Sequence, residues 1–306
     1  MGWFKQTARA ATLGLAVAAL PALAQTETPP SAMTGLRFSQ VNGGGGVPLN
    51  VVEKGDPTKP AIVFIHGYRQ SYLSWIYQFQ SSLADHCHLI AFDLRGHGNS
   101  GVPWRADGYT NERMWAEDVA AVIKATGAKQ PLVVAWSFGG NVAMDFVRYH
   151  AAERLSGLWL VSTAAGMFAP PQPPKGAPPR PTATADLDAN IAGVDSSNNF
   201  LFGKTVDPAL VKKFTAAGMR TSPFVDRAIA QLGPKTNTDL VARLRAPVTL
   251  VFGGKDPVVA PPLAAKVAAV FPGSRAETYA DAGHAPFLED PVRFNAALDA
   301  AQCKVP

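Results

Sequence analysis

The chain has 306 residues, 47% of them hydrophobic and 17% charged, and its formal net charge at pH 7 is +5. This length suits one large α/β domain with an insertion. A charge this small, with no cluster of basic residues, excludes the electrostatic pattern typical of nucleic-acid-binding proteins.

The first 24 residues have the three parts of a secretory signal. A flank with Lys5 and Arg9 precedes an apolar run over residues 10–20, and an Ala-Leu-Ala triplet ending at Ala24 supplies a cleavage site. The run is too short to span a bilayer, although an ordinary amphipathic first helix is an alternative. We therefore expect cleavage after Ala24, a flexible lead over residues 25–35, and a soluble periplasmic or secreted mature protein without a membrane span.

Two β-like segments, residues 36–41 and 47–53, are joined by Asn42 and four glycines, which predicts a hairpin. From residue 61 onward, short apolar runs alternate with apolar residues at helical spacing. This alternation is typical of a mostly parallel sheet with helices on both faces. The apolar runs predict strands over residues 61–65, 88–92, 133–136, 158–161 and 248–252, and a further strand is expected over residues 276–279. Helical spacing predicts helices over residues 72–83, 111–126, 262–270 and 291–301, with another directly after Ser137.

One long segment interrupts the alternation. Residues 169–181 contain seven prolines, too many for a helix or a central strand, and the residues after them have the apolar spacing of short helices. We predict an inserted, mainly helical cap over residues 166–244, between two parts of the α/β core, residues 36–165 and 245–306. The alternative is a structural subdomain with no role in access to a site.

The pentapeptide from Ala135 to Gly139 places Ser137 between a strand and a helix, with small residues two positions before and after it. This is the form of the G-x-S-x-G nucleophile elbow, in which small residues let strand and helix approach closely around a serine. Ala135 departs from the motif, and a serine at a helix N-terminus is more often only a cap. Partners elsewhere in the chain therefore decide its role.

A catalytic serine needs an imidazole to take its proton and a carboxylate to fix that imidazole's tautomer. Downstream of Ser137 the sequence has only His150 and His284. His150 lies at the far end of the helix after Ser137, roughly 20 Å away, which leaves His284. Asp256 follows the strand over residues 248–252, and ligand sites of open parallel sheets lie beyond the carboxyl ends of strands. We therefore predict a catalytic triad of Ser137, Asp256 and His284.

The oxyanion of the tetrahedral intermediate needs backbone donors. We assign the N–H groups of Phe138, which follows the serine, and Tyr68, which follows the strand over residues 61–65. His66 and Gly67 would shape that turn, and His66 is a less suitable alternative base.

Five further residues are candidates for the substrate pocket: Trp136, Phe200, Phe202, Phe224 and Arg69. The alternative is that the aromatic residues are ordinary core and that the arginine is an exposed loop residue. We expect no metal and no cofactor.

These motifs follow one another in a recognisable order: His66-Gly67-Tyr68, Asp93 to Ser100, Ala135 to Gly139, Gly254 to Asp256, and Gly283-His284. The chain resembles the α/β-hydrolase fold family over nearly all of residues 36–301, and is most similar to its capped serine esterases and haloperoxidase-like hydrolases. The resemblance implies the triad and oxyanion roles assigned above and a mainly structural role for Asp93 to Ser100. Family members with an aspartate nucleophile act on epoxides or haloalkanes, but Ser137 stands in that place here.

The implied fold also brings the two cysteines together. Cys87 precedes the strand over residues 88–92, and Cys303 follows the last helix, so both should lie at the edge of the sheet opposite the site. We predict a Cys87–Cys303 disulfide, which an exported protein can keep; two unrelated buried thiols are the alternative.

Together these features predict an exported serine hydrolase that cleaves a small-molecule carboxylic ester, lactone or related acyl bond through an acyl-enzyme intermediate. The same triad also serves carbon–carbon bond hydrolases and perhydrolases. A ligand-binding protein of the same fold without useful turnover is the third interpretation.

Overall fold

The computed structural model describes residues 34–150, 155–168, 186–202, 206–233 and 235–304. The predicted signal segment, nearly all of the lead and the proline-rich stretch over residues 169–181 lie outside the described residues. No helix within the described ranges is long and apolar enough to cross a membrane.

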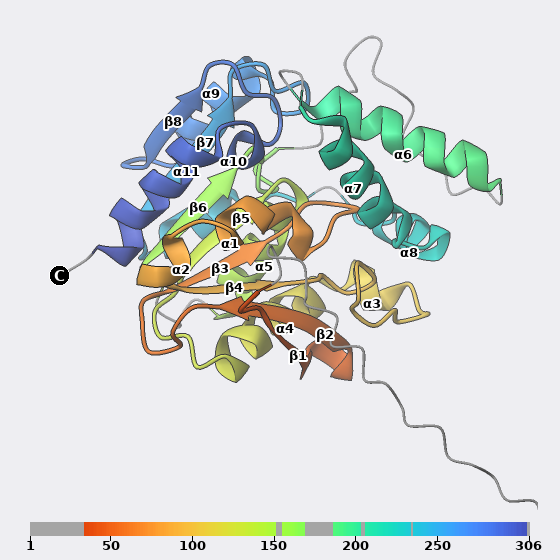
Figure 1. The fold of residues 1–306 in the computed structure, drawn as a ribbon, viewed down its shortest axis with the longest axis horizontal. Helices are drawn as coiled ribbons and strands as arrows, with labels where there is room; N and C mark the ends of the chain where they lie inside the picture. The colour runs from red at the N-terminus through yellow and green to blue at the C-terminus, as the bar shows by residue number, and fades with distance from the viewer. Residues whose placement is uncertain (1–33, 151–154, 169–185, 203–205, 234, 305–306) are drawn as a thin grey trace, which may run out of the picture. The chain divides into compact units, whose positions relative to one another are not determined.

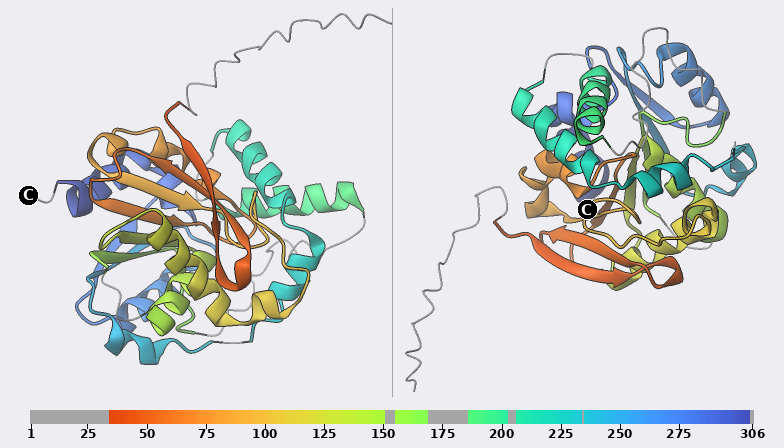
Figure 2. Two further views of the ribbon diagram at one scale, coloured as in Figure 1. Left: turned by 90° about the horizontal axis from the view of Figure 1, so that it is seen from below. Right: turned by 90° about the vertical axis from the view of Figure 1, so that its right-hand side faces the viewer.

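An eight-stranded sheet with the order β1-β2-β4-β3-β5-β6-β7-β8 forms the centre of the protein (Figure 1). The β1–β2 and β2–β4 pairs are antiparallel, and every pair from β4 onward is parallel. Figure 2 shows the β1–β2 pair at one edge of this sheet. The strands are β1 (Arg37–Asn42), β2 (Pro48–Lys54), β3 (Ala61–Ile65), β4 (His88–Phe92), β5 (Leu132–Trp136), β6 (Gly157–Val161), β7 (Val248–Gly253) and β8 (Arg275–Tyr279).

Helices cover both faces of the sheet because the central strands are apolar on both sides. In β3, Val63 and Ile65 belong to one core cluster, whereas Ile62 and Phe64 belong to the other, as expected when side chains alternate along a strand. The first cluster is closed by α4 (Glu112–Ala125), α5 (Phe138–His150) and α9 (Pro261–Val270). The second is closed by η3 (Tyr72–Trp75), α1 (Ile76–Phe79), α2 (Leu83–His86), α10 (Pro286–Glu289) and α11 (Pro291–Leu298).

The single helix expected over residues 72–83 is instead three short helical segments, η3, α1 and α2. Ser81 explains the last break, because its hydroxyl donates to the Gln78 carbonyl and accepts from the Leu83 N–H. Such local side-chain bonds offer the backbone an alternative to continuing the helix. The short helices α3 (Asp107–Thr110) and α10 were not predicted.

The segment that interrupts the sheet is helical, with α6 (Leu187–Leu201), α7 (Pro208–Met219), α8 (Pro223–Ile229) and the 3-10 segment η4 (Thr238–Arg243). Asp186, Asp207 and Ser222 cap the first three, each accepting a bond from a backbone N–H in the first turn. In Figure 1 these three helices lie together on the right. Residues of α7 also belong to the second core cluster and residues of α8 to the first. We call α6, α7 and α8 the cap.

A disulfide joins Cys87, directly before β4, to Cys303 in the last turn, η5 (Asp299–Cys303), with Cα atoms 5.3 Å apart. Cys87 is fully buried against the second core cluster. The bond spans 216 positions of sequence, so it constrains a very large loop of the unfolded chain.

Removing this bond should destabilise the protein without changing its fold. Replacing both cysteines by serine is expected to lower the free energy of unfolding by about 2–5 kcal/mol, because the unfolded chain regains the entropy of the open loop. Urea denaturation of the oxidised wild type and the double variant measures this difference. Two titratable thiols in the denatured, unreduced wild type would contradict the linkage.

Candidate active site

Ser137 sits at a sharp turn between β5 and α5, and its φ of 52° lies in the left-handed region. A non-glycine residue there is strained and persists only where its surroundings fix it. Gly139 provides one such constraint: a Cβ on it would lie 2.6 Å from the Ile65 carbonyl oxygen and 2.7 Å from that of His66. Only glycine therefore lets the first turn of α5 approach β3 this closely. Ala135 is fully buried in β5, so its methyl group is accommodated.

Ser137, His284 and Asp256 form one hydrogen-bonded chain. The Ser137 Oγ is 2.9 Å from His284 Nε2, and His284 Nδ1 is 2.9 and 3.0 Å from the two Asp256 carboxylate oxygens. An ionised carboxylate can only accept hydrogen bonds, so Nδ1 carries the proton and the lone pair of Nε2 faces the serine hydroxyl. The structure thus brings together the three residues that the sequence indicates, in the geometry of a nucleophile, a base and an orienting acid.

Backbone groups hold the acid in place. The Asp256 Oδ1 accepts bonds from the N–H groups of Val258 and Val259, at 2.8 and 2.9 Å. Burial by itself raises the pKa of Asp256, but the electrostatic interaction and hydrogen bond with His284 and the two backbone hydrogen bonds outweigh it and bring the pKa below its ordinary value. Asp256 is therefore ionised at neutral pH.

The histidine loop is held from two sides. The indole Nε1 of Trp136 donates to the His284 carbonyl at 2.7 Å, and the His284 N–H donates to the carbonyl of Leu201, the last residue of α6, also at 2.7 Å. Trp136 is only 2% exposed and packs against Phe287. This residue therefore lies in the core beneath the histidine loop rather than on an open pocket wall.

Residues 67–70 form a tight turn at the carboxyl end of β3, which we call the oxyanion turn. The turn lies against the serine, since a Cβ on Gly67 would be 3.2 Å from the Ser137 Cβ. Its closing bond runs from the Gln70 N–H to the Gly67 carbonyl at 3.3 Å. Tyr68 and Phe138, whose N–H groups we assign to the oxyanion hole, are thus the residues directly after Gly67 and Ser137.

His66 orients this turn. Its Nε2 accepts a bond from the Leu94 N–H at 2.9 Å, so its Nδ1 carries the proton and donates to the Gly67 carbonyl at 2.7 Å. Burial lowers the pKa of His66 to about 4, and the ring is neutral at pH 7. Both ring nitrogens are occupied by backbone groups, which fits an orienting residue and not a catalytic base.

The other candidate pocket residues lie in or beside the cap and in the oxyanion turn. Phe202 packs edge-on against Phe214 with ring centroids 6.1 Å apart, and Phe224 packs at a tilted angle of 49° against Trp104 with ring centroids 5.4 Å apart. Phe200 lies partly exposed in the last turn of α6. Arg69 is 7% exposed, and its guanidinium is bonded to Asp226 of α8. Arg69 is therefore a buried ion-pair partner rather than an exposed loop arginine.

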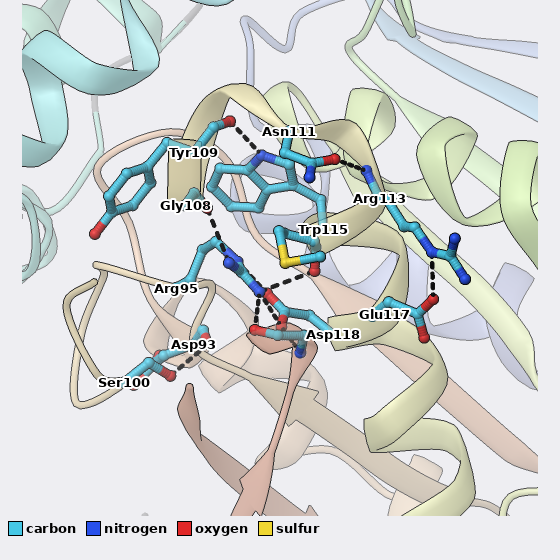
Figure 3. Close-up of polar contacts among 12 residues, drawn as sticks. Asp93, Arg95, Ser100, Gly108, Tyr109, Asn111, Arg113, Trp115, Glu117 and Asp118 are labelled. Atoms are coloured by element: carbon cyan, nitrogen blue, oxygen red, sulfur yellow. Dashed lines mark hydrogen bonds and ion pairs between the residues drawn. The ribbon is translucent and has the colours of Figure 1, made fainter. Parts of the chain in front are cut away.

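The segment from Asp93 to Ser100 is structural, as the family resemblance implies. Arg95 is 1% exposed and forms an ion pair with Asp118 of α4, and it also donates to the carbonyls of Gly108 and Met114 (Figure 3). The Ser100 hydroxyl donates to the Asp93 carbonyl at 2.6 Å. These bonds tie the loop after β4 to α4.

Three residues that contact the candidate site were not predicted from the sequence. They are Asp226, Asn198 and Leu201, all in the cap. Asp226 contacts residues 157 and 158 positions earlier in the chain, and the Leu201 contact to His284 uses only backbone atoms. No local sequence pattern specifies such contacts. Among the described residues, no group of three or more histidine, cysteine or acidic side chains is placed to hold a metal ion.

Comparison with known proteins finds similar sequences and structures among hydrolases. A sequence model described as alpha/beta hydrolase fold matches residues 60–291. The crystal structure of a Burkholderia cenocepacia protein assigned as an aryl esterase is 34% identical, with a TM-score of 0.79 over 86% of this chain and 97% of that chain. An esterase from Rhodococcus sp. ECU1013 is 28% identical, with a TM-score of 0.76 over 86% and 97%. Epoxide hydrolase 1 of Caenorhabditis elegans is 35% identical over 104 residues, 34% of this chain and 25% of that protein.

The neutral histidines beside the oxyanion turn should make the fold sensitive to acid. Burial lowers the pKa of His97 to about 3, from an ordinary value of 6.5. Below pH 6.5 the unfolded chain therefore binds protons that the folded chain does not. As the pH is lowered, the free energy of unfolding decreases by ~1.4 kcal/mol per pH unit for each such histidine. His97→Asn, which keeps a donor for the Arg95 carbonyl, should remove about that much of the slope between pH 6 and pH 4.5.

Urea unfolding at several pH values measures the slope for wild type and variant. An unchanged slope in a folded His97→Asn protein would show that His97 is already protonated in the native state.

Proposed function

The chain belongs to the α/β-hydrolase fold family, and we propose that within it the protein is a serine hydrolase of carboxylic esters and lactones. The observation that carries the proposal is the 2.9 Å contact between the Ser137 hydroxyl and His284 Nε2, whose other nitrogen is bonded to Asp256. The two esterases with TM-scores above 0.75, both at least 28% identical, support the ester class.

In the proposed reaction, Ser137 Oγ attacks the acyl carbon while His284 Nε2 takes its proton. The imidazolium then gives this proton to the leaving alcohol oxygen as the carbon–oxygen bond breaks, which leaves an acyl group on Ser137. A water molecule, deprotonated by the same nitrogen, attacks the acyl carbon, and the serine leaves with the proton. Asp256 stays ionised throughout and stabilises the imidazolium that forms twice per cycle.

The negative oxygen of each tetrahedral intermediate would lie between the N–H groups of Tyr68 and Phe138. The oxyanion turn lies against Ser137, and Phe138 begins α5, whose N-terminal dipole also favours negative charge. Donors fixed in advance in this way cost no reorganisation during the reaction, and each contributes a few kcal/mol.

Family members that open epoxides use an aspartate nucleophile, which forms an ester that water hydrolyses. Ser137 occupies that position, and its alkoxide is suited to acyl transfer. This is why we propose an ester or lactone substrate although an epoxide hydrolase is among the relatives by sequence.

Replacing Ser137 by alanine should abolish hydrolysis. We expect kcat for p-nitrophenyl acetate to fall by roughly 10⁴-fold or more, because no other group supplies the nucleophile. A fluorophosphonate probe should label wild type on the Ser137 peptide and leave the variant unlabelled. Ser39→Ala, which removes an exposed hydroxyl of β1, is the matched control and should keep full activity. Unchanged turnover in folded Ser137→Ala would rule out the proposal.

We also propose that the protein is exported and matures by cleavage after Ala24. The basic flank, apolar run and Ala-Leu-Ala triplet support this, as does a disulfide, which an oxidising compartment maintains. Expressed with a C-terminal tag in a Gram-negative host, the protein should be recovered from the periplasm with Gln25 as its first residue. N-terminal sequencing that finds the chain starting at Met1 would contradict export.

A further inference from the structure

We propose that Asp226 of the cap is a positioning residue for the oxyanion turn, so that the cap sets the rate of hydrolysis and not only access to the site. This inference rests on the proposed serine hydrolase function. Asp226 is 6% exposed and lies in the first turn of α8. Its carboxylate is the point at which that helix contacts two successive residues of the turn.

The contacts of Asp226 converge on the residues that present the oxyanion donor. The Tyr68 hydroxyl donates to Asp226 Oδ1 at 2.7 Å, and the Arg69 Nε donates to the same oxygen at 3.0 Å. The Arg69 Nη2 donates to the second carboxylate oxygen, which makes the ion pair bidentate. Such a pair fixes orientation as well as distance.

The backbone of the turn needs this support. Arg69 has a φ of 56°, in the left-handed region that disfavours residues other than glycine. Its side chain is also buried, and a buried guanidinium without its carboxylate is unfavourable. Loss of Asp226 therefore removes what holds Arg69 in this conformation, and the peptide group between Gly67 and Tyr68 is one residue away.

Two further contacts join the cap to the oxyanion turn. The Gln70 side chain, 3% exposed, donates to Asn198 of α6 at 3.3 Å, and Asn198 donates in turn to Thr215 of α7. A Cβ on Gly218 of α7 would lie 3.2 Å from the Arg69 carbonyl oxygen. Each of the three cap helices thus touches the oxyanion turn, and α6 also holds His284 through Leu201.

The test is Asp226→Asn, which keeps the size of the side chain and an acceptor for Tyr68 but removes the charge. We expect kcat for p-nitrophenyl acetate to fall at least tenfold with KM within threefold of wild type, because the oxyanion donor is displaced while a small acyl group still binds. The rate of Ser137 labelling by a fluorophosphonate should fall in parallel, since phosphonylation also develops charge on an oxygen in the oxyanion hole. A kcat within twofold of wild type would overturn the proposal.

Arg220→Ala is the matched control. Arg220 directly follows α7 and joins it to the loop after β4 through the Gly98 carbonyl and the Asn99 side chain. It does not contact the oxyanion turn in any hydrogen bond of the described residues. A general loosening of the cap would affect both variants alike, whereas the positioning role predicts Arg220→Ala within twofold of wild type. Equal losses in kcat for the two variants would overturn the proposal.

A second variant tests the same role if Asp226→Asn does not fold. Combining Arg69→Met with Asp226→Leu replaces the ion pair by apolar side chains of similar volume, an exchange that folded proteins tolerate. This folded double variant should still lose at least tenfold in kcat, and wild-type kcat would overturn the positioning role. Wild type that hydrolyses no ester or lactone would instead overturn the proposed function.

Discussion

The close approach of α5 to β3 is the constraint on which the candidate site depends. Gly139 lies so near the Ile65 and His66 carbonyl oxygens that a methyl group would overlap them, and this contact forces the chain to reverse sharply at Ser137. The strained φ of Ser137 is the local consequence. Because β3 and β5 are parallel neighbours, the same approach brings the turn after β3 against the serine. Ser137 and residues 67–70 are therefore placed by one packing contact.

The acid and the histidine are placed by a second contact of the same kind. Their loops follow β7 and β8, which are also parallel neighbours, and the loops pack backbone against backbone. A Cβ on Gly253 would overlap the Gly283 carbonyl, and one on Gly254 would lie 2.5 Å from the Ala280 carbonyl oxygen. The Lys255 N–H also donates to the Ala282 carbonyl at 2.9 Å. Glycines at these positions thus let Asp256 reach His284 across the gap between two strands.

The features that could be predicted from the sequence are those that depend on a pattern of neighbouring residues. Apolar runs located the strands over residues 61–65 and 88–92 at their observed bounds, because buried strands leave a continuous hydrophobic signal. Ser137 and Asp256 could be chosen because each follows such a strand. His284 could be chosen because the other downstream histidine, His150, lies at the far end of α5. Periodicity could not predict the break of the helix at Ser81, which depends on one hydroxyl. It also could not assign Trp136, because an aromatic residue beside the serine can line a pocket or fill the core, and only the bond to the His284 carbonyl distinguishes these two roles.

The contacts between the cap and the candidate site could not be predicted from the sequence, for a physical reason. Its contacts to the site are single polar pairs across a long separation in sequence, such as Arg69 with Asp226 and His284 with Leu201. Buried polar groups need partners wherever they lie, and the core alone leaves the Arg69 guanidinium and the His284 N–H without them. The described cap residues supply both. Because the insertion supplies these hydrogen bonds, its described residues help to fix the conformation of the loops that carry the candidate site.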